Sequence, residues 1–150
     1  MSDVELIGSG DQRLVQAAEL ALASAGLRGH LAVELVDADR IAALNREHRG
    51  RDAPTDVLSF PDDEDRPVGA APRELGDVVI CPEYAADMPE AVIHGVLHLT
   101  GMDHERDDGE MLALQRELRS WRSAAIEKIL LFWMLTLSMT LMTYRDLLRN

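Results

Sequence analysis

Residues 87–104 read DMPEAVIHGVLHLTGMDH, and this stretch predicts a helix that ends in a sharp turn. Asp87 and Glu90 have the spacing of a capping box, and Pro89 suits the first turn of a helix. The apolar residues that follow continue the helix to about Thr100. Gly101 predicts its end, because glycine readily adopts the positive φ at which a chain leaves a helix.

Three of the five histidines of the chain fall in this stretch, at His94, His98 and His104. His94 and His98 are four residues apart, so a helix places both on one face, within reach of one ion. The turn at Gly101 can bring His104 back to supply a third nitrogen. Three nitrogen ligands leave a fourth position for solvent, which is typical of a catalytic zinc site. One zinc ion per chain is the expected cofactor, although iron or nickel could occupy the same nitrogens.

The spacing of these histidines, H-x3-H-x5-H, also occurs in metzincin proteases, whose pattern is H-E-x-x-H-x-x-G-x-x-H. In those enzymes the glutamate after the first histidine is the general base for the attacking water. Gly95 occupies that position here. The glycine therefore argues against peptide hydrolysis.

Short apolar segments alternate with capped helical segments along the rest of the chain. Asp11 and Asp37 can each cap a helix, and the second of these helices stops near Gly50. A last helix is expected from about Asp107 to Arg122, and an exposed loop over Asp62–Arg73. The pattern predicts an α/β (α+β) fold with a mixed, roughly four-stranded sheet flanked by helices. The expected strands are Val4–Ile7, Leu31–Val36, Val57–Phe60 and Leu75–Ile80.

The bulk properties favour a small cytoplasmic protein. The 150 residues fit one domain, and a hydrophobic fraction of 47% is enough for one core. The formal charge of −12 argues against a broad surface that coats nucleic acid, but a local basic patch can still bind RNA. Cys81 is the only cysteine, so no internal disulfide forms, and the first residues do not resemble a secretory signal.

Three segments carry a resemblance to a known family. Residues 44–61 read LNREHRGRDAPTDVLSFP, residues 75–80 read LGDVVI, and residues 94–104 read HGVLHLTGMDH. They are similar to L-N-x-x-Y-R-x-K-D-x-P-T-D-V-L-S-F-P, L-G-D-I-V-I and H-G-x-L-H-L-x-G-Y-D-H of the YbeY family of bacterial endoribonucleases. His48 and Met102 stand where that family has aromatic residues. The resemblance covers residues 1 to about 122.

The resemblance implies a zinc-dependent, single-strand-specific endoribonuclease. Such an enzyme acts in ribosomal RNA maturation, especially at the 3′ end of the small-subunit RNA, and in ribosome quality control. Single-stranded or ribosomal RNA is then the substrate, and the ribosome or its small subunit is the partner. The implied metal ligands are His94, His98 and His104. Arg49 and His94 are the expected catalytic residues.

Arg49 also suits phosphate chemistry on physical grounds. A planar guanidinium can hold a phosphate with two hydrogen bonds and stabilise charge that develops in the transition state. Residues 40–51 contain four arginines and one glutamate, which gives a local formal charge of +3. We expect this segment to meet an RNA backbone, and a solvated helix face is the alternative.

The C-terminal residues do not match the family. We therefore predict a YbeY-like catalytic domain over residues 1–122 and an apolar extension over residues 123–150. Residues 129–144 carry no charge. As a helix they would span about 24 Å, which is shorter than the ~30 Å hydrocarbon core of a bilayer. Three alternatives stay open for this segment: a helix packed against the domain or against a second copy of the chain, a membrane-surface or marginally spanning anchor, and a poorly ordered or non-native extension.

Two other functions stay open at this point. One is a different metallohydrolase, such as a peptidase whose base comes from elsewhere in the chain. The other is a non-enzymatic ribosome-associated factor in which a structural metal holds the turn. For RNA cleavage itself, either a water molecule or a ribose 2′-hydroxyl could attack the phosphodiester.

Overall fold

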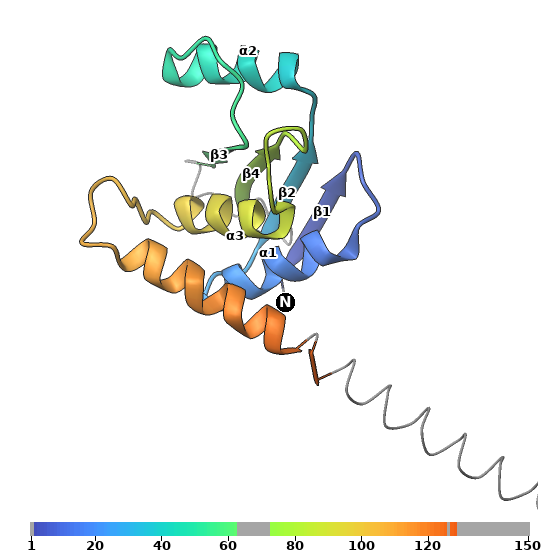
Figure 1. Cartoon of the computed structure of the whole chain (residues 1–150), viewed down its shortest axis with the longest axis vertical. Helices are drawn as coiled ribbons and strands as arrows, with labels where there is room; N and C mark the ends of the chain where they lie inside the picture. The colour runs from blue at the N-terminus through green and yellow to red at the C-terminus, as the bar shows by residue number, and fades with distance from the viewer. Residues whose placement is uncertain (1, 63–72, 126, 129–150) are drawn as a thin grey trace, which may run out of the picture. The chain divides into compact units, whose positions relative to one another are not determined.

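The computed structural model describes residues 2–62, 73–125 and 127–128 (Figure 1). A helix that begins at Glu110 follows the seven labelled elements. The predicted α+β class is confirmed. The predicted loop Asp62–Arg73 lies almost entirely outside the described residues. In chain order the labelled elements are β1 (Asp3–Ile7), α1 (Gln12–Ser24), β2 (His30–Leu35), α2 (Ala38–Arg49), β3 (Val57–Pro61), β4 (Glu74–Ile80) and α3 (Met88–Leu99).

Internal contacts divide the chain into two units, Met1–Leu118 and Arg119–Asn150. The first unit holds the sheet and the three histidines. In the second unit, residues 119–125 are helical. The apolar segment 129–144 lies outside the described residues, so its predicted role stays a prediction. Among the described residues, no helix has both the length and the apolar character needed to cross a bilayer.

The four strands form one mixed sheet in the order β1-β2-β4-β3. Neighbouring strands are parallel from β1 through β2 to β4, whereas β3 runs antiparallel to β4. The register of this last pair joins Val57 to Ile80 and Pro61 to Gly76. The predicted four-stranded mixed sheet is therefore confirmed, and β3 lies at one of its edges.

The two faces of the sheet bury different cores, because successive side chains of a strand point to opposite faces. Val57 and Val78 belong to the larger core, which includes the buried residues of α1 and α3. Their neighbours Leu58 and Val79 belong to a smaller core with Ile41 and other residues of α2. Figure 1 shows the corresponding arrangement, with α2 apart from α1 and α3.

Aspartate caps start the first three helices where the sequence predicts them. The side chains of Asp11, Asp37 and Asp87 accept hydrogen bonds from backbone N–H groups of the first helical turn. These bonds satisfy donors that have no partner within the helix. At the other end of α2, Gly50 has φ +67°, as its predicted role requires.

The last helix begins at Glu110, three residues later than predicted. Asp107 does interact with its start, because its carboxylate accepts hydrogen bonds from the N–H groups of Gly109 and Met111. Gly109 itself has φ +91°, which is not a helical conformation. The aspartate therefore caps the helix from a turn that precedes it.

Gly95 allows α3 to lie close to the sheet. A Cβ built on this residue would lie 2.6 Å from Cγ1 of Val78 and 3.1 Å from Cγ2 of Val57. The hydroxyl of Ser59 on β3 donates a hydrogen bond of 2.8 Å to the carbonyl oxygen of Gly95. Close packing and this bond together fix α3 against the edge of the sheet formed by β3 and β4.

Replacing Gly95 with alanine is expected to lower the free energy of unfolding by about 1–2 kcal/mol. Overpacking typically costs ~1–3 kcal/mol, and a Cβ only 2.6 Å from Cγ1 of Val78 puts the cost in the upper half of that range, at about 2–3 kcal/mol. The better helix propensity of alanine offsets about 1 kcal/mol of it. Urea denaturation of both proteins measures the difference. Gly10→Ala is the matched control, because nothing lies within 4 Å of a Cβ built on Gly10. A Gly95→Ala protein as stable as the wild type would contradict this account of the packing.

Candidate metal centre

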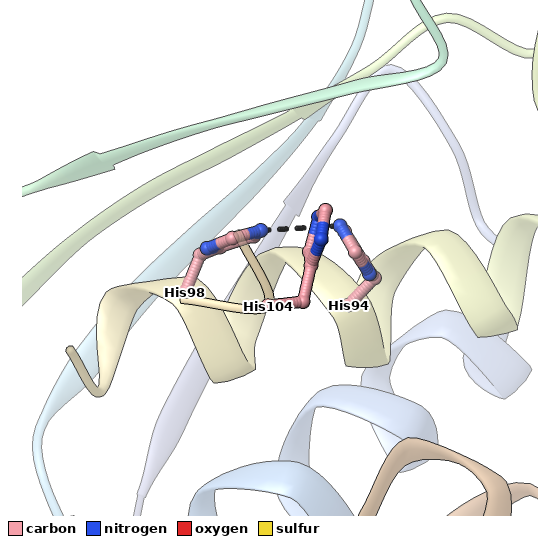
Figure 2. Close-up of side chains that lie close together, drawn as sticks. All are labelled: His94, His98 and His104. Carbon is pink, nitrogen blue, oxygen red and sulfur yellow. Dashed lines mark hydrogen bonds between the residues drawn. The ribbon is translucent and has the colours of Figure 1, made fainter. Parts of the chain in front are cut away.

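Two neighbouring elements bring the three histidines together. His94 and His98 lie one turn apart on α3, and His104 lies in the segment after the helix. Gly101, with φ +88°, turns the chain back after the helix, as predicted. Figure 2 shows the three partly buried rings turned toward one another. One ring nitrogen from each histidine lies within 4.8 Å of the other two.

The outer nitrogens of two of these rings have hydrogen-bond partners that determine where their protons lie. Nδ1 of His98 is 3.0 Å from the carbonyl oxygen of Met102, and Nδ1 of His94 is 2.8 Å from Oε1 of Gln115. Both oxygens are acceptors, so each Nδ1 carries the proton. In the neutral rings, each Nε2 therefore has a free lone pair.

These two lone pairs face each other across a short gap. Nε2 of His94 lies 3.2 Å from Nε2 of His98, a contact that is unfavourable between two unprotonated nitrogens. A cation between them would remove the repulsion. Two nitrogens at ~2.0–2.1 Å from one tetrahedral zinc ion are about 3.3 Å apart, which agrees with this separation. The three histidines therefore fit a single metal ion.

The surroundings of His98 favour the form that binds metal. Burial lowers the pKa of His98, and the neighbouring His94 lowers it further by charge repulsion. A lowered pKa keeps the imidazole neutral to more acidic pH. Only a neutral ring can offer its lone pair to a cation, so the lowered pKa of His98 favours the form of this residue that can bind metal.

The packing of α3 explains why residue 95 is not the glutamate of a metzincin protease. Gly95 faces β3 and β4 at a distance that has no room for a Cβ. A larger side chain would push α3, and with it His94 and His98, away from the sheet. The fold therefore leaves no space for the side chain of a general base at residue 95.

A cleft of about 470 Å³ contains all three histidines. Residues of β3 form one part of its lining, and the segment around the end of α2 contributes Arg49 and Arg51. Arg49 thus lies in the same cleft as the three histidines. Asp56 and Glu105 also line the cleft, and sequence analysis did not assign either of them to chemistry.

The predicted basic segment is divided by the structure. Arg49 and Arg51 line the cleft, but Arg46 does not, and it pairs with Asp52 at 3.2 Å. The buried side chain of Asn45 connects α2 to the following loop, because its Nδ2 donates a 2.8 Å hydrogen bond to the carbonyl of Ala53. This bond fixes the loop that returns from α2 to β3, and with it the path of the chain around the two arginines.

Other polar residues, both inside and outside the matching segments, have structural partners. The carboxylate of Asp103 accepts a hydrogen bond from the N–H of Glu105 and pairs with Arg106 at 3.3 Å, which supports the turn. His30 lies outside the cluster, at the start of β2, where Nδ1 is 2.8 Å from Glu74. Gln115, which holds His94, was not found by sequence analysis, because a single glutamine in a helix carries no recognisable signal.

The amino-acid sequence of this chain is similar to those of known proteins. The family model described as Endoribonuclease YbeY matches residues 11–121. An Endoribonuclease YbeY from Salinispora tropica is 44% identical over 117 residues, which cover 62% of this chain and 74% of that protein. Another from Koribacter versatilis is 40% identical over 127 residues, which cover 77% and 79% of the two chains.

Among solved structures, the solution structure of TM1509 from Thermotoga maritima has 30% sequence identity to this chain and a TM-score of 0.48. The match covers 81% of this chain and 93% of that one. The matched residues 11–121 include the cleft arginines and all three histidines. On the family match and the curated relatives, this chain belongs to the YbeY endoribonuclease family.

Proposed function

We propose that this protein is a zinc-dependent, single-strand-specific endoribonuclease of ribosomal RNA maturation. Its expected substrate region is the 3′ end of the small-subunit RNA, and its expected wider role is ribosome quality control. The observation that carries the proposal is that one cleft contains three histidines suited to one metal ion together with Arg49. The proposal includes the ribosome or its small subunit as partner and the cytoplasm as location.

Different residues of the cleft can take different roles in phosphodiester cleavage. When bound to the three histidines, a divalent cation supplies Lewis-acid activation of the phosphate ester. Arg49 can hold a non-bridging phosphate oxygen pair and stabilise the charge that develops on it. Asp56 and Glu105 are the carboxylates among the lining residues, and they can accept the proton of the attacking hydroxyl.

The formal charges of the cleft suggest that RNA binds better when a metal ion is bound. Its lining contains two arginines and two carboxylates, so these formal charges cancel. With three neutral histidines, a divalent cation would make the cleft positive. Binding of a phosphate backbone depends on such local positive charge, particularly in a protein with a formal charge of −12.

Two rings in the cleft support a preference for single strands. His48 and Phe60 both line it, and their ring centroids are 4.7 Å apart in an edge-to-face arrangement. His48 is exposed, and Phe60 is half-buried against the smaller core and supports it. An exposed ring such as that of His48 can stack on a base that is free of a duplex. A paired base cannot leave its stack without an energetic cost, so these rings favour unpaired RNA.

RNA cleavage is expected to require the three-histidine centre. His98→Ala, or treatment of the wild type with a chelator, should lower the rate of cleavage of a labelled single-stranded RNA at least about a hundredfold, since metal activation contributes several kcal/mol. Added zinc should restore the chelated wild type but not the variant. His30→Ala is the matched control, because His30 pairs with Glu74 outside the cluster.

Three results would argue against this proposed function. Cleavage by His98→Ala at the wild-type rate would contradict the proposal. Turnover of casein without turnover of RNA would indicate a peptidase-like metallohydrolase. A melting temperature that falls on chelation, in a protein that never cleaves RNA, would indicate a structural metal in a ribosome-associated factor.

Arg49→Ala is expected to lower kcat/KM for the same RNA by about 100- to 1000-fold, the range found when one donor to a developing oxyanion is removed. Arg49→Lys should recover only part of the loss, because an ammonium group lacks the planar pair of donors. Steady-state kinetics measure both variants. Arg28→Ala removes the same charge outside the cleft and should leave kcat/KM unchanged. Equal kinetics for Arg49→Ala and wild type would remove Arg49 from the mechanism.

His48→Ala is expected to raise KM for single-stranded RNA about fivefold to 100-fold, the range for loss of one base-stacking contact. His48→Tyr should keep KM near the wild-type value, because it retains an aromatic ring. The matched control is Tyr84→Ala, which removes an exposed ring outside the cleft. Identical KM values for the alanine and tyrosine variants at position 48 would argue against stacking there.

A further inference from the structure

His94 is held in place by a hydrogen bond from its outer nitrogen to a residue of a neighbouring helix. Gln115 lies on the helix that begins at Glu110, and its Oε1 accepts the hydrogen bond of 2.8 Å from Nδ1 of His94. The amide nitrogen of the same side chain donates a hydrogen bond of 3.1 Å to Oε1 of Glu90. A single partly buried side chain therefore connects two residues of α3.

We propose that Gln115 is a positioning residue that selects the metal-binding tautomer of His94. Its oxygen holds the proton of His94 on Nδ1, which leaves the lone pair on Nε2, the nitrogen that faces His98. The inference rests on the metal site proposed above, and it concerns metal binding rather than RNA cleavage. Partners of this kind fix the orientation of a ligand ring and raise its basicity.

Glu90 determines which end of the amide faces His94. A glutamine side chain can present either oxygen or nitrogen to its neighbour, and its partners decide between them. The carboxylate of Glu90 can only accept, so the NH₂ group of Gln115 turns toward it and the oxygen turns toward His94. Glu90 and His94 are four residues apart on α3, which puts both on the same face of that helix.

His94 depends on this side chain in a way that His98 does not. The equivalent proton of His98 is held by the backbone carbonyl of Met102, so no substitution at residue 102 removes that acceptor. The acceptor for His94 comes from a residue 21 positions along the chain, on another helix. The proton of His94 is therefore held on Nδ1 only when the helix that carries Gln115 packs correctly against α3.

The first test uses Gln115→Met, which keeps the size of the side chain and removes both hydrogen bonds. Zinc affinity, measured by competition with a chelating dye, should fall about 10- to 100-fold. In the metal-free variant, heteronuclear NMR of the imidazole nitrogens should show His94 moving from the Nδ1–H tautomer toward Nε2–H, the form favoured in water. Gln16→Met, on the exposed surface of α1, is the matched control and should change neither readout.

A second variant separates positioning from simple packing. The double substitution Glu90→Gln with Gln115→Glu keeps both hydrogen bonds and the total charge, with a carboxylate now accepting from His94. The double variant should bind zinc at least as tightly as the wild type and keep the Nδ1–H tautomer of His94. If Gln115→Met fails to fold, this double variant still tests whether residue 115 positions His94.

Unchanged zinc affinity and tautomer in a folded Gln115→Met protein would overturn the inference, as would weak zinc binding by the double variant. Neither readout uses RNA. A wild-type protein that binds zinc but does not cleave RNA would therefore defeat the proposed function and leave this inference standing.

Discussion

The three-histidine cluster is organised around two imidazole lone pairs that face each other at 3.2 Å. They face each other because the outer nitrogens of His94 and His98 are occupied by oxygen acceptors from Gln115 and Met102. With both protons held on the far side of the rings, a cation between the two nitrogens would make the arrangement favourable. Packing and hydrogen bonding thus hold a contact that is unfavourable without a cation, and His104 offers a third nitrogen within 4.8 Å of the other two.

The position of that contact is set by how closely α3 approaches the sheet. Gly95 removes the side chain that would keep the helix away from Val57 and Val78, and the Ser59 hydroxyl adds a direct bond across the gap. The same close approach places the edge strand β3 along the cleft. One missing Cβ therefore accounts both for the absence of a metzincin-type glutamate and for a cleft bounded by an edge strand.

The formal charges of the side chains that line the cleft balance one another. The two arginines are balanced by Asp56 and Glu105, so an acidic protein does not present a strongly basic groove. The basic segment expected from sequence is divided, since Arg46 pairs with Asp52 while Arg49 and Arg51 reach the cleft. In the proposed enzyme, a bound cation would supply the local positive charge that phosphate binding needs.

The sequence by itself determined the elements and the spacing that brings the histidines together. Aspartate caps, glycine stops and the period of apolar residues are local signals, and the i, i+4 spacing of His94 and His98 needs only a helix to bring them together. The start of the last helix was missed because Asp107 caps it from a separate turn. Only the tertiary structure decided that Gln115 holds His94, that Gly95 meets Val78 and that Arg49 shares a cleft with the histidines. Each of these contacts joins residues far apart in the chain, and their geometry follows from packing between elements, for which a single sequence carries no local pattern.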